Sequence, residues 1–511
     1  MRIVIRVDAS RDIATGHVMR CLTLASALRH RGASVSFVCR EHPGHLCGLI
    51  EERGFSVSRL PPPRAASGAD GDLAHSSWLG ASWRDDAQQT IGALGGRPDW
   101  LVVDHYALDR RWEGELRPSV GGIMAIDDLA DRAHDCDLLL DQNLVAHMHE
   151  RYNGKVPEAC ALLLGTDYAL LQPMFSELRS RVPPAEGAVR RLLIYFGGVD
   201  SDDLTGRALS AFLTLKRPDI QADVVFSSGS AHADALRKRA AGHANVRLHS
   251  GLLTLAPLMF QADMAVGAGG ATSWERLCLG LRCLVVTTAE NQRAVAEELH
   301  RRGLINWLGR KEDLDEAALA REMSRMIEGL SPRRVASALD GKGVERVSVA
   351  LTLNDSVPLR VRFVRPHDEG ILLDWANDLT TRRNSLAPDR IGEETHRAWL
   401  ANYLCRSDDR RLCIVETTDG VALGQVRFTR QERVWEVHYA IGPAYRGRGL
   451  GRPLLEAALE SLIRDVPGAT IYGRVKDSNL RSCKIFESLG FAVRPGPQSG
   501  TRIYQRAYKG N

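Results

Sequence analysis

A histidine at position 17 stands directly after Gly16, in the stretch ATGHVMRC at residues 14–21. The stretch follows a short apolar run, IVIRV at 3–7, and opens a segment with helical periodicity. The N-terminus of a helix disfavours imidazolium, so this ring is expected to stay neutral and able to accept a proton. Gly16 leaves room for a ligand beside it. The alternative is a helix-terminal histidine with no chemical role.

A second candidate is the turn GAGGATSWE at 267–275, which follows an expected strand and opens a helix. Glycines let backbone amides approach a phosphate closely, and the helix N-terminus favours negative charge. A tight strand-to-helix turn is the alternative, because Thr272 occupies the third glycine position of a dinucleotide fingerprint. Thr272 and Glu275 also have the spacing of a capping box, and spacing alone favours capping over ligand binding. The acidic tail of FGGVDSDD at 196–203 predicts a turn without direct phosphate contact.

A third turn, AYRGRGLGRP at 444–453, follows the alternating stretch VWEVHYAIG and precedes an amphipathic helix. It fits R/Q-x-x-G-x-G/A, a pattern in which successive amides and the helix N-terminus can cradle a pyrophosphate. A basic solvated turn is the alternative. The residues of the pattern are Arg446, Gly447, Arg448, Gly449, Leu450 and Gly451.

The elements that position these turns fall into three blocks. Apolar strands alternate with helix-period segments through the first two thirds, which predicts parallel, doubly wound sheets. This rhythm restarts after the Pro/Gly/charge hinge at 181–191, so two α/β halves are expected to face each other across a cleft. From about 359 the pattern alternates with period two, as in antiparallel strands. The stretch 331–358 is predicted to hold a terminal helix, a glycine-containing turn and a linker. The expected domains are 1–182, 183–350, a linker at 351–358, and an α+β domain at 359–511.

Composition limits the function classes. The chain has 511 residues, 44% hydrophobic and 25% charged, with a formal net charge of +4. Such a balance predicts a globular protein of several domains and gives no reason to expect nucleic-acid or membrane partners. The ten cysteines include no C-x-x-C pair, so no zinc or redox site is indicated. Without a signal-peptide core or an apolar run of about 18 residues, a cytoplasmic enzyme is expected.

Several motifs together resemble the PseG family. These are VDAS…IATGHVMRCLTLASAL near the start, DHY at 104–106, YFGGVD at 195–200, GAGGATSWERLCLG at 267–280 and ENQ at 290–292. PseG proteins are UDP-2,4-diacetamido-2,4,6-trideoxy-β-L-altropyranose hydrolases of pseudaminic acid synthesis and relatives of MurG-type GT-B glycosyltransferases. The resemblance covers about residues 1–350. It implies a GT-B-like pair of Rossmann-type domains and a metal-free hydrolysis with inversion at the anomeric carbon.

The resemblance also implies site residues. His17 would be the base that activates water, with Asp8 positioning the sugar or the water network. Tyr106 and Asn291 would be polar groups near the sugar, although a strand-end aromatic and a loop cap are the plain alternatives. Glu275 would bind the ribose. The remaining substrate contacts would be Gly269, Gly270, Thr272, Ser273 and Gln292.

The C-terminal block resembles GNAT acetyltransferases, which use acetyl-CoA. Beside the 446–451 turn, NLRSCKIFESLGF at 479–491 matches a second family segment, which implies that Asn479 touches the pantetheine arm with Ser482 close by. Many members have a tyrosine acid where this chain has Phe486, so solvent or Tyr472 is left as the acid. Glu436 or His438 could be the base, or both could be structural.

Residues 375–400 are similar to the acceptor-side helices of PseH, a GNAT enzyme acting on the same UDP-sugar series. This similarity implies acceptor-site roles for Arg382, Asn384 and His396. The expectation is a bifunctional enzyme with a UDP-sugar and acetyl-CoA as substrates. The sequence does not predict its oligomeric state. The rival hypotheses are a GT-B glycosyltransferase fused to a GNAT domain, the same two steps in another nonulosonate pathway, and a non-catalytic nucleotide-sugar binding protein.

Overall fold

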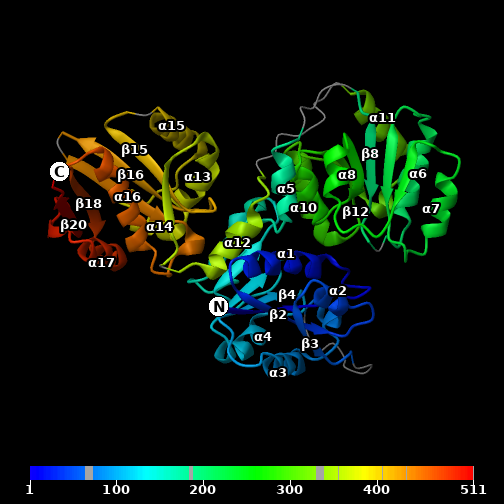
Figure 1. Cartoon of the computed structure of the whole chain (residues 1–511), viewed down its shortest axis with the longest axis horizontal. Coiled ribbons are helices and arrows are strands. Elements are labelled where there is room, and N and C mark those ends of the chain that lie inside the picture. Colours follow the sequence, from blue (N-terminus) through cyan, green and yellow to red (C-terminus); the bar gives the residue numbers. More distant parts are fainter. Residues whose placement is uncertain are drawn as a thin grey trace. The chain divides into compact units, whose positions relative to one another are not determined.

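The computed structural model divides the chain into two compact units, Met1–Ser348 and Val349–Asn511, and each is considered by itself (Figure 1). The structure describes residues 1–63, 73–182, 188–198, 200–329, 339–354, 356–405, 407–432 and 434–509. The predicted domain boundary after residue 182 lies next to residues 183–187, which are outside the described residues. These five residues also belong to the predicted hinge at 181–191.

The first unit begins with a seven-stranded, fully parallel sheet. Its strands, in spatial order, are β3 (Ser56–Leu60), β2 (Ser34–Arg40), β1 (Arg2–Val7), β4 (Trp100–Asp104), β5 (Gly122–Ile126), β6 (Leu138–Asp141) and β7 (Ala161–Leu164). The connecting helices are α1 (Gly16–His30), α2 (Cys47–Glu52), α3 (Trp83–Ala93) and α4 (Arg110–Leu116). The continuous apolar runs noted in the sequence are buried strands, as parallel sheets covered on both faces require.

A second parallel sheet follows in the same unit. Its spatial order is β10 (Val246–His249), β9 (Gln221–Val225), β8 (Arg191–Tyr195), β11 (Met264–Ala268), β12 (Arg282–Thr287) and β13 (Asn306–Arg310). Its helices are α6 (Leu204–Thr214), α7 (Ala233–Ala240), α8 (Ala256–Gln261), α9 (Thr272–Cys278), α10 (Arg293–Arg301) and α11 (Glu316–Glu328), and α5 (Pro173–Arg179) precedes it.

The two sheets repeat one strand order. Counted within each half, both orders run third, second, first, fourth, fifth and sixth strand, which is the doubly wound Rossmann order, and the first half adds β7 as a seventh strand. The predicted GT-B-like pair of Rossmann-type domains is therefore confirmed. In such sheets, ligands bind beyond the carboxyl ends of the strands, where the order reverses. Those points lie between β1 and β4 in the first half and between β8 and β11 in the second.

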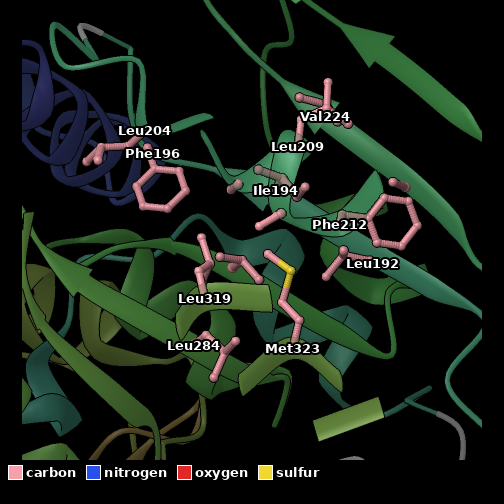
Figure 2. Packing of buried hydrophobic residues seen from close by; sticks show 14 of the residues in the cluster. Leu192, Ile194, Phe196, Leu204, Leu209, Phe212, Val224, Leu284, Leu319 and Met323 are labelled. Carbon is pink, nitrogen blue, oxygen red and sulfur yellow. The ribbon is translucent and has the colours of Figure 1, made fainter. Parts of the chain in front are cut away.

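The core of the second half shows how the sequence pattern fixes this layering (Figure 2). Alternate residues of β8, Leu192 and Ile194, point to one face of the sheet, where α6 contributes Phe212 and α11 contributes Met323. All four are at most 1% exposed. Burying each such side chain contributes about 1.5–3 kcal/mol, which is enough to hold both helices on this face.

Helix α12 (Gly343–Thr352) differs from the prediction for 331–358. The helix lies after the glycine-containing turn and extends into the expected linker, because Val344, Val347 and Leu351 recur at helical spacing and are fully buried. Residues 330–338, where the terminal helix was expected, are outside the described residues.

The second unit holds a mixed sheet ordered β14 (Leu359–Phe363), β15 (Arg410–Thr417), β16 (Ala422–Gln431), β17 (Val434–Ile441), β18 (Thr470–Lys476), β20 (Thr501–Ala507) and β19 (Ala492–Pro495). All neighbours are antiparallel except β17 and β18. That parallel pair joins only residues 434–436 to 470–472, so the later residues of both strands have no mutual pairing.

The helices of this unit are α13 (Glu369–Asn377), α14 (Leu379–Asn384), α15 (Glu393–Leu404), α16 (Gly451–Asp465) and α17 (Leu480–Ser488). The period-two strands predicted from residue 359 are present. Among the helices of the described residues, none has the length and apolar character needed to cross a bilayer.

Candidate active sites

The first candidate site is built around His17, in the first turn of α1 between β1 and β4. Its side chain is 10% exposed, and Nδ1 lies 2.6 Å from Oδ1 of Asp104, the last residue of β4. Because β1 and β4 are neighbours in the sheet, their carboxyl ends bring these two residues together from 87 positions apart. This is the point where the strand order reverses.

Asp104 is anchored by Arg20, one helical turn after His17. The guanidinium donates to both carboxylate oxygens, at 2.7 and 2.6 Å, and also reaches Asp128 at 2.6 Å. Burial alone would raise the pKa of Asp104, but the charge of Arg20 and then that of His17 outweigh it and hold that pKa well below its usual range. Asp104 is therefore a fixed, ionised carboxylate at neutral pH.

This geometry fixes the tautomer of His17. Two acceptors cannot share a 2.6 Å contact, so Nδ1 carries a hydrogen and donates it to Asp104. A neutral ring then has its lone pair on Nε2, for which the described residues show no hydrogen-bond partner. The arrangement is that of a general base oriented by a carboxylate.

Tyr106 lies against the same ring. Its hydroxyl donates to Asp128 at 2.8 Å, and its ring meets the His17 ring edge-on at 4.7 Å between centroids. Burial and the nearby Asp128 raise the pKa of Tyr106 well above its usual value, so the phenol stays protonated. Asp128 thus links Tyr106 to Arg20. The sequence prediction missed Asp104, Arg20 and Asp128, although DHY at a strand end and the i, i+3 spacing of His17 and Arg20 were usable signals.

Asp8, predicted to position the sugar, is fully buried in a separate network. Its carboxylate accepts hydrogen bonds from Arg6 at 2.6 Å and from the amide of Arg40 at 2.7 Å. His105 and His42 lie 3.4 and 3.6 Å from its other oxygen. These contacts tie β1 to β2, which favours a structural role for Asp8.

The second candidate site is the turn between β11 and α9. Gly270 has φ +97°, a conformation that other residues adopt only with strain. A side chain at Gly269 would meet Oε1 of Gln292 at 3.0 Å, so the glycine lets Gln292 lie against the turn. The buried Arg276 braces the turn from behind by donating to the carbonyl of Ala268 at 2.6 Å.

Glu275 does not form the capping box that its spacing predicted. Helix α9 begins at Thr272, with Ala271 at the N-cap and no side-chain cap, so Thr272 is already inside the helix. Ser273 accepts instead from Arg276 at 3.2 Å. The half-buried Glu275 has no hydrogen-bond partner among the described residues, and burial raises its pKa to about 7, against a smaller lowering by Arg276.

Two nearby loops complete this region. Asn291 is exposed in the short 3-10 turn Glu290–Gln292, while Gln292 folds back onto Thr288, whose amide donates to Oε1 at 2.9 Å. In the turn after β8, the carboxylate of Asp200 accepts from the amides of Leu204 and Thr205, each at 2.9 Å. Asp200 therefore occupies the N-terminus of α6 and takes up two of its amides.

The third candidate site is the turn before α16. Gly447 and Gly449 have φ +77° and +78°, and their amides have no backbone partner among the described residues. Arg446 points away from the turn and donates to Asp378 at 2.5 Å and Thr381 at 2.7 Å. Arg448 reaches the carbonyl of Leu351 at 3.5 Å.

Helix α16 begins directly after this turn. Leu450 is the N-cap and Gly451 is the first residue of α16, where a side chain would collide with Ile485. The amides, and not the arginines, are free to receive a phosphate.

Asn479 and Ser482 lie at the start of α17. The Asn479 side chain caps the helix by accepting from the amide of Ser482 at 3.3 Å. The Ser482 hydroxyl accepts from Tyr439 of β17 at 3.0 Å. Tyr439 is a polar residue of this region that the sequence prediction missed.

On the other face of β17, Glu436 and His438 contact each other. Nε2 of His438 lies 3.3 Å from Glu436, and Arg474 donates to the same carboxylate at 2.7 Å. The hydrogen bond from His438 and then Arg474 hold the pKa of Glu436 at about 2, against the effect of burial. Such a carboxylate is a weak base, so the geometry favours His438, oriented by Glu436, over Glu436 itself. Tyr472 donates to Gln431 at 2.9 Å beside them.

Of the three residues predicted for the acceptor side, two donate hydrogen bonds to backbone carbonyls and one is buried. Arg382 donates to the carbonyls of Ala387 and Asp389 at 3.1 and 3.2 Å, and Asn384 to that of Thr380 at 3.0 Å. His396 is 2% exposed, and burial lowers its pKa. Across the residues for which the structure gives positions, no cluster of His, Cys, Asp and Glu could hold a metal ion.

Residues 359–492 match the family model described as an acetyltransferase (GNAT) domain. The chain has a C-terminal GNAT domain. This match falls within the second unit and includes the turn before α16, β17 and α17.

Three relatives extend the comparison. An uncharacterized protein of Methanocaldococcus jannaschii is 22% identical over 99% of both chains. The spore coat polysaccharide biosynthesis protein SpsG of Bacillus subtilis is 32% identical over 37% of this chain and 57% of its own length. The UDP-2,4-diacetamido-2,4,6-trideoxy-beta-L-altropyranose hydrolase of Campylobacter jejuni is 25% identical over 59% of this chain and 97% of its own length. The chain thus joins a region homologous to this hydrolase with the GNAT domain.

Proposed function

We propose that the first unit hydrolyses a UDP-linked 2,4-diacetamido-2,4,6-trideoxy sugar to the free sugar and UDP. We further propose that the GNAT domain makes the substrate by acetylating the 4-amino group of its precursor with acetyl-CoA. The homology to the altropyranose hydrolase supports the sugar series. The contact of His17 with Asp104, 2.6 Å long at the point where the strand order reverses, is the observation that carries the hydrolytic step.

In this mechanism Nε2 of His17 takes a proton from water as the oxygen attacks the anomeric carbon. The imidazolium that forms is stabilised by the ionised Asp104, which Arg20 holds in place. The bond between the anomeric carbon and the UDP oxygen breaks with its electron pair on UDP, so the carbon is inverted. Tyr106 keeps the imidazole ring in place, and its hydroxyl oxygen can accept a hydrogen bond from the sugar while its hydrogen stays on Asp128.

The turn after β11 would hold the departing nucleotide. The amide of Gly270 and the first turn of α9, with Thr272 and Ser273, would face the charge that grows on the diphosphate, and the helix dipole favours it. The amide of Gly269 donates to the carbonyl of Val286 at 3.2 Å, so Gly269 would contribute by leaving room for the diphosphate. Glu275 would accept from the ribose hydroxyls, a role that its unpartnered carboxylate leaves open. Asn291 and Gln292 would border the sugar on the loop after β12. The step needs no metal in this scheme.

In the GNAT domain, the amides of Gly447 and Gly449 and the start of α16 would bind the pyrophosphate of acetyl-CoA. The pantetheine would pass Asn479 and Ser482 toward the region where β17 and β18 are no longer paired. His438 would take the proton of the acceptor amine, and Arg382, Asn384 and His396 would shape the acceptor side. The shared chain would raise the local concentration of the acetylated product near the hydrolase.

The test uses the full chain with a panel of UDP-4-amino-4,6-dideoxy-N-acetyl sugars and acetyl-CoA in heavy-oxygen water. Mass spectrometry should find one acetyl group added to the sugar, and then label on the free sugar and none on UDP. Release of UDP only in the presence of a second sugar would instead indicate a glycosyltransferase. Binding of the UDP-sugar with no release of UDP would indicate a non-catalytic binding protein.

Assigning the pathway depends on which sugar of the panel reacts. Preference for the altro configuration would place the chain in pseudaminic acid synthesis. Preference for another configuration would place the same two reactions in a different nonulosonate route.

A further inference from the structure

The GNAT domain contains a half-buried tyrosine hydroxyl that the proposed mechanism does not use. Tyr439 lies on β17, three residues beyond Glu436, the last residue paired with β18. Its hydroxyl donates to Oγ of Ser482 at 3.0 Å, and its ring meets Phe486 edge-on at 6.0 Å between centroids. The hydroxyl therefore lies at the start of α17, beside the region in which the two strands have no mutual pairing.

A hydrogen-bond donor at this place would favour acetyl transfer from a thioester, because the departing thiolate takes an electron pair. Phe486 has no hydroxyl, and the structure leaves no room for one. The ring is 2% exposed and stacked on Tyr504 at 5.3 Å. A Cβ atom added at Gly473 would lie only 2.5 Å from Cζ of Phe486, so the tip of the ring faces the backbone of β18. Position 486 is a packing position in this chain.

Tyr472, the other candidate acid, lies on the opposite side of the sheet from Tyr439. Its hydroxyl donates to Gln431, whose amide in turn donates to Glu436 at 3.2 Å. Side chains at positions 436 and 439 point to opposite faces of β17, because successive residues of a strand alternate. Tyr439 and Ser482 therefore form a hydroxyl pair on the α17 face.

We propose that the hydroxyl pair of Tyr439 and Ser482 donates a hydrogen bond to the thiolate that leaves acetyl-CoA, an inference that rests on the proposed acetyltransferase function. The acceptor nitrogen attacks the thioester carbonyl and an N–C bond forms. The C–S bond then breaks with its electron pair on sulfur, and the Tyr439 hydroxyl turns from Ser482 to donate a hydrogen bond to that sulfur, which takes its proton from solvent. Ser482 turns to donate to the Tyr439 oxygen, while the amine proton goes to His438.

The electrostatics agree with this role. Burial raises the pKa of Tyr439 to about 12, against a smaller lowering by Ser482, so the hydroxyl holds its proton at neutral pH. Tyr439 therefore stays a phenol beside the developing thiolate, because a thiol is the stronger acid of the two, and it stabilises the leaving sulfur as a hydrogen-bond donor.

The first test needs no acceptor. Coenzyme A is bound to the full chain and its thiol is titrated by the ultraviolet absorbance of the thiolate. A hydroxyl donor beside sulfur should make the bound thiol roughly tenfold more acidic in the wild type than in Tyr439→Phe. Ser482→Ala should have a smaller effect in the same direction. The matched control is Tyr403→Phe, which removes a hydroxyl of α15 that is bonded to Thr429 of β16, and this variant should behave like the wild type.

The second test follows thiol release from acetyl-CoA with the sugar panel as acceptor. Tyr439→Phe should lower kcat by at least about tenfold with KM for acetyl-CoA unchanged. Three results would each overturn the proposal. These are unchanged kcat and thiol acidity in Tyr439→Phe, a raised KM alone, or the tenfold loss of kcat in Tyr472→Phe and not in Tyr439→Phe. If no sugar is acetylated, the proposed acceptor class fails, while the thiol titration still decides the role of Tyr439. Far-ultraviolet circular dichroism verifies that each variant is folded.

Discussion

The two halves of the first unit share one strand order, yet their reversal points carry opposite kinds of groups. Between β1 and β4 lie the charged residues Asp104 and Arg20 beside His17, fixed by hydrogen bonds of 2.6–2.7 Å. Between β11 and α9 lie Gly269, Gly270 and a single acidic side chain without a hydrogen-bond partner among the described residues. One point holds an imidazole ring in a fixed orientation, and the other leaves a backbone amide and a carboxylate without partners among the described residues.

This difference shows what the shared fold decides and what it leaves to local sequence. Both sheets direct a loop and a helix N-terminus to the same place. In the first half, charged side chains neutralise each other there, which keeps a ring in one orientation. In the second half, small residues leave the backbone amide of Gly270 without a hydrogen-bond partner among the described residues. The fold supplies the location, and the residues at the strand ends supply the chemistry.

The largest effect is expected from removing the ring of the first half. In His17→Ala, the hydrolysis rate should fall by about a thousandfold, because general base catalysis is lost. Affinity for UDP, measured by calorimetry, should stay unchanged, because the nucleotide is assigned to the second half. His30→Ala, at the exposed end of the same helix, is the control. Equal loss of UDP binding in His17→Ala would contradict the division between the halves.

Asp104→Asn should act more mildly on the same half. Asparagine cannot fix the tautomer of His17 or neutralise Arg20, so hydrolysis should fall by about a hundredfold. Breaking the buried ion pair should also lower the free energy of unfolding by about 3 kcal/mol, measured with urea. Asp99→Asn, exposed just before the start of the same strand, should change neither quantity strongly. An active Asp104→Asn would show that Asp104 is only structural.

The comparison of the two halves also shows which features could be predicted from the sequence and which could not. Strand positions and glycine turns follow from local patterns, so the doubly wound halves and the 267–275 turn could be predicted. The pairing of His17 with Asp104 depends on strand order, which no local pattern contains. Glu275 matched a capping box by spacing, but the helix begins at Thr272 and shifts the register of the cap. Tyr439 was missed because its partner Ser482 lies on a distant helix.

In the second half, Gly270→Ala should weaken UDP binding by roughly tenfold. An alanine at φ +97° costs about 1–2 kcal/mol, and relaxing that strain would move the amides of the turn. Gly303→Ala is the matched control, because it also has positive φ, at +69°, but lies after α10. Both variants should lose stability, measured by thermal unfolding, and only Gly270→Ala should lose affinity for UDP. Equal affinities would remove the turn from the nucleotide site.

The smallest effect is expected from the charge of Glu275. With its pKa raised to about 7 by burial, the carboxylate is half ionised near neutral pH, and ribose hydroxyls donate best to the ionised form. Ionisation of Glu275 should therefore improve UDP affinity by roughly fivefold as the pH rises from about 6 to 8. Glu275→Gln should leave only the dependence that comes from the terminal phosphate of UDP, whose second pKa is about 6. Glu297→Gln, exposed on α10, should keep the improvement that comes from Glu275.

Stability gives an independent measure of the same group. The folded protein keeps the Glu275 proton up to about pH 7, whereas the unfolded chain loses it near the ordinary value of 4.5. The unfolded state therefore binds fewer protons between these values, and the contribution of Glu275 to the free energy of unfolding falls as the pH rises. Glu275→Gln should remove that decline. The variant could bind UDP like the wild type at every pH and yet be more stable at pH 8. Burial of Glu275 would then lower the stability of the protein without contributing to nucleotide binding. The contrast between the two halves would in that case rest on the glycine turn alone.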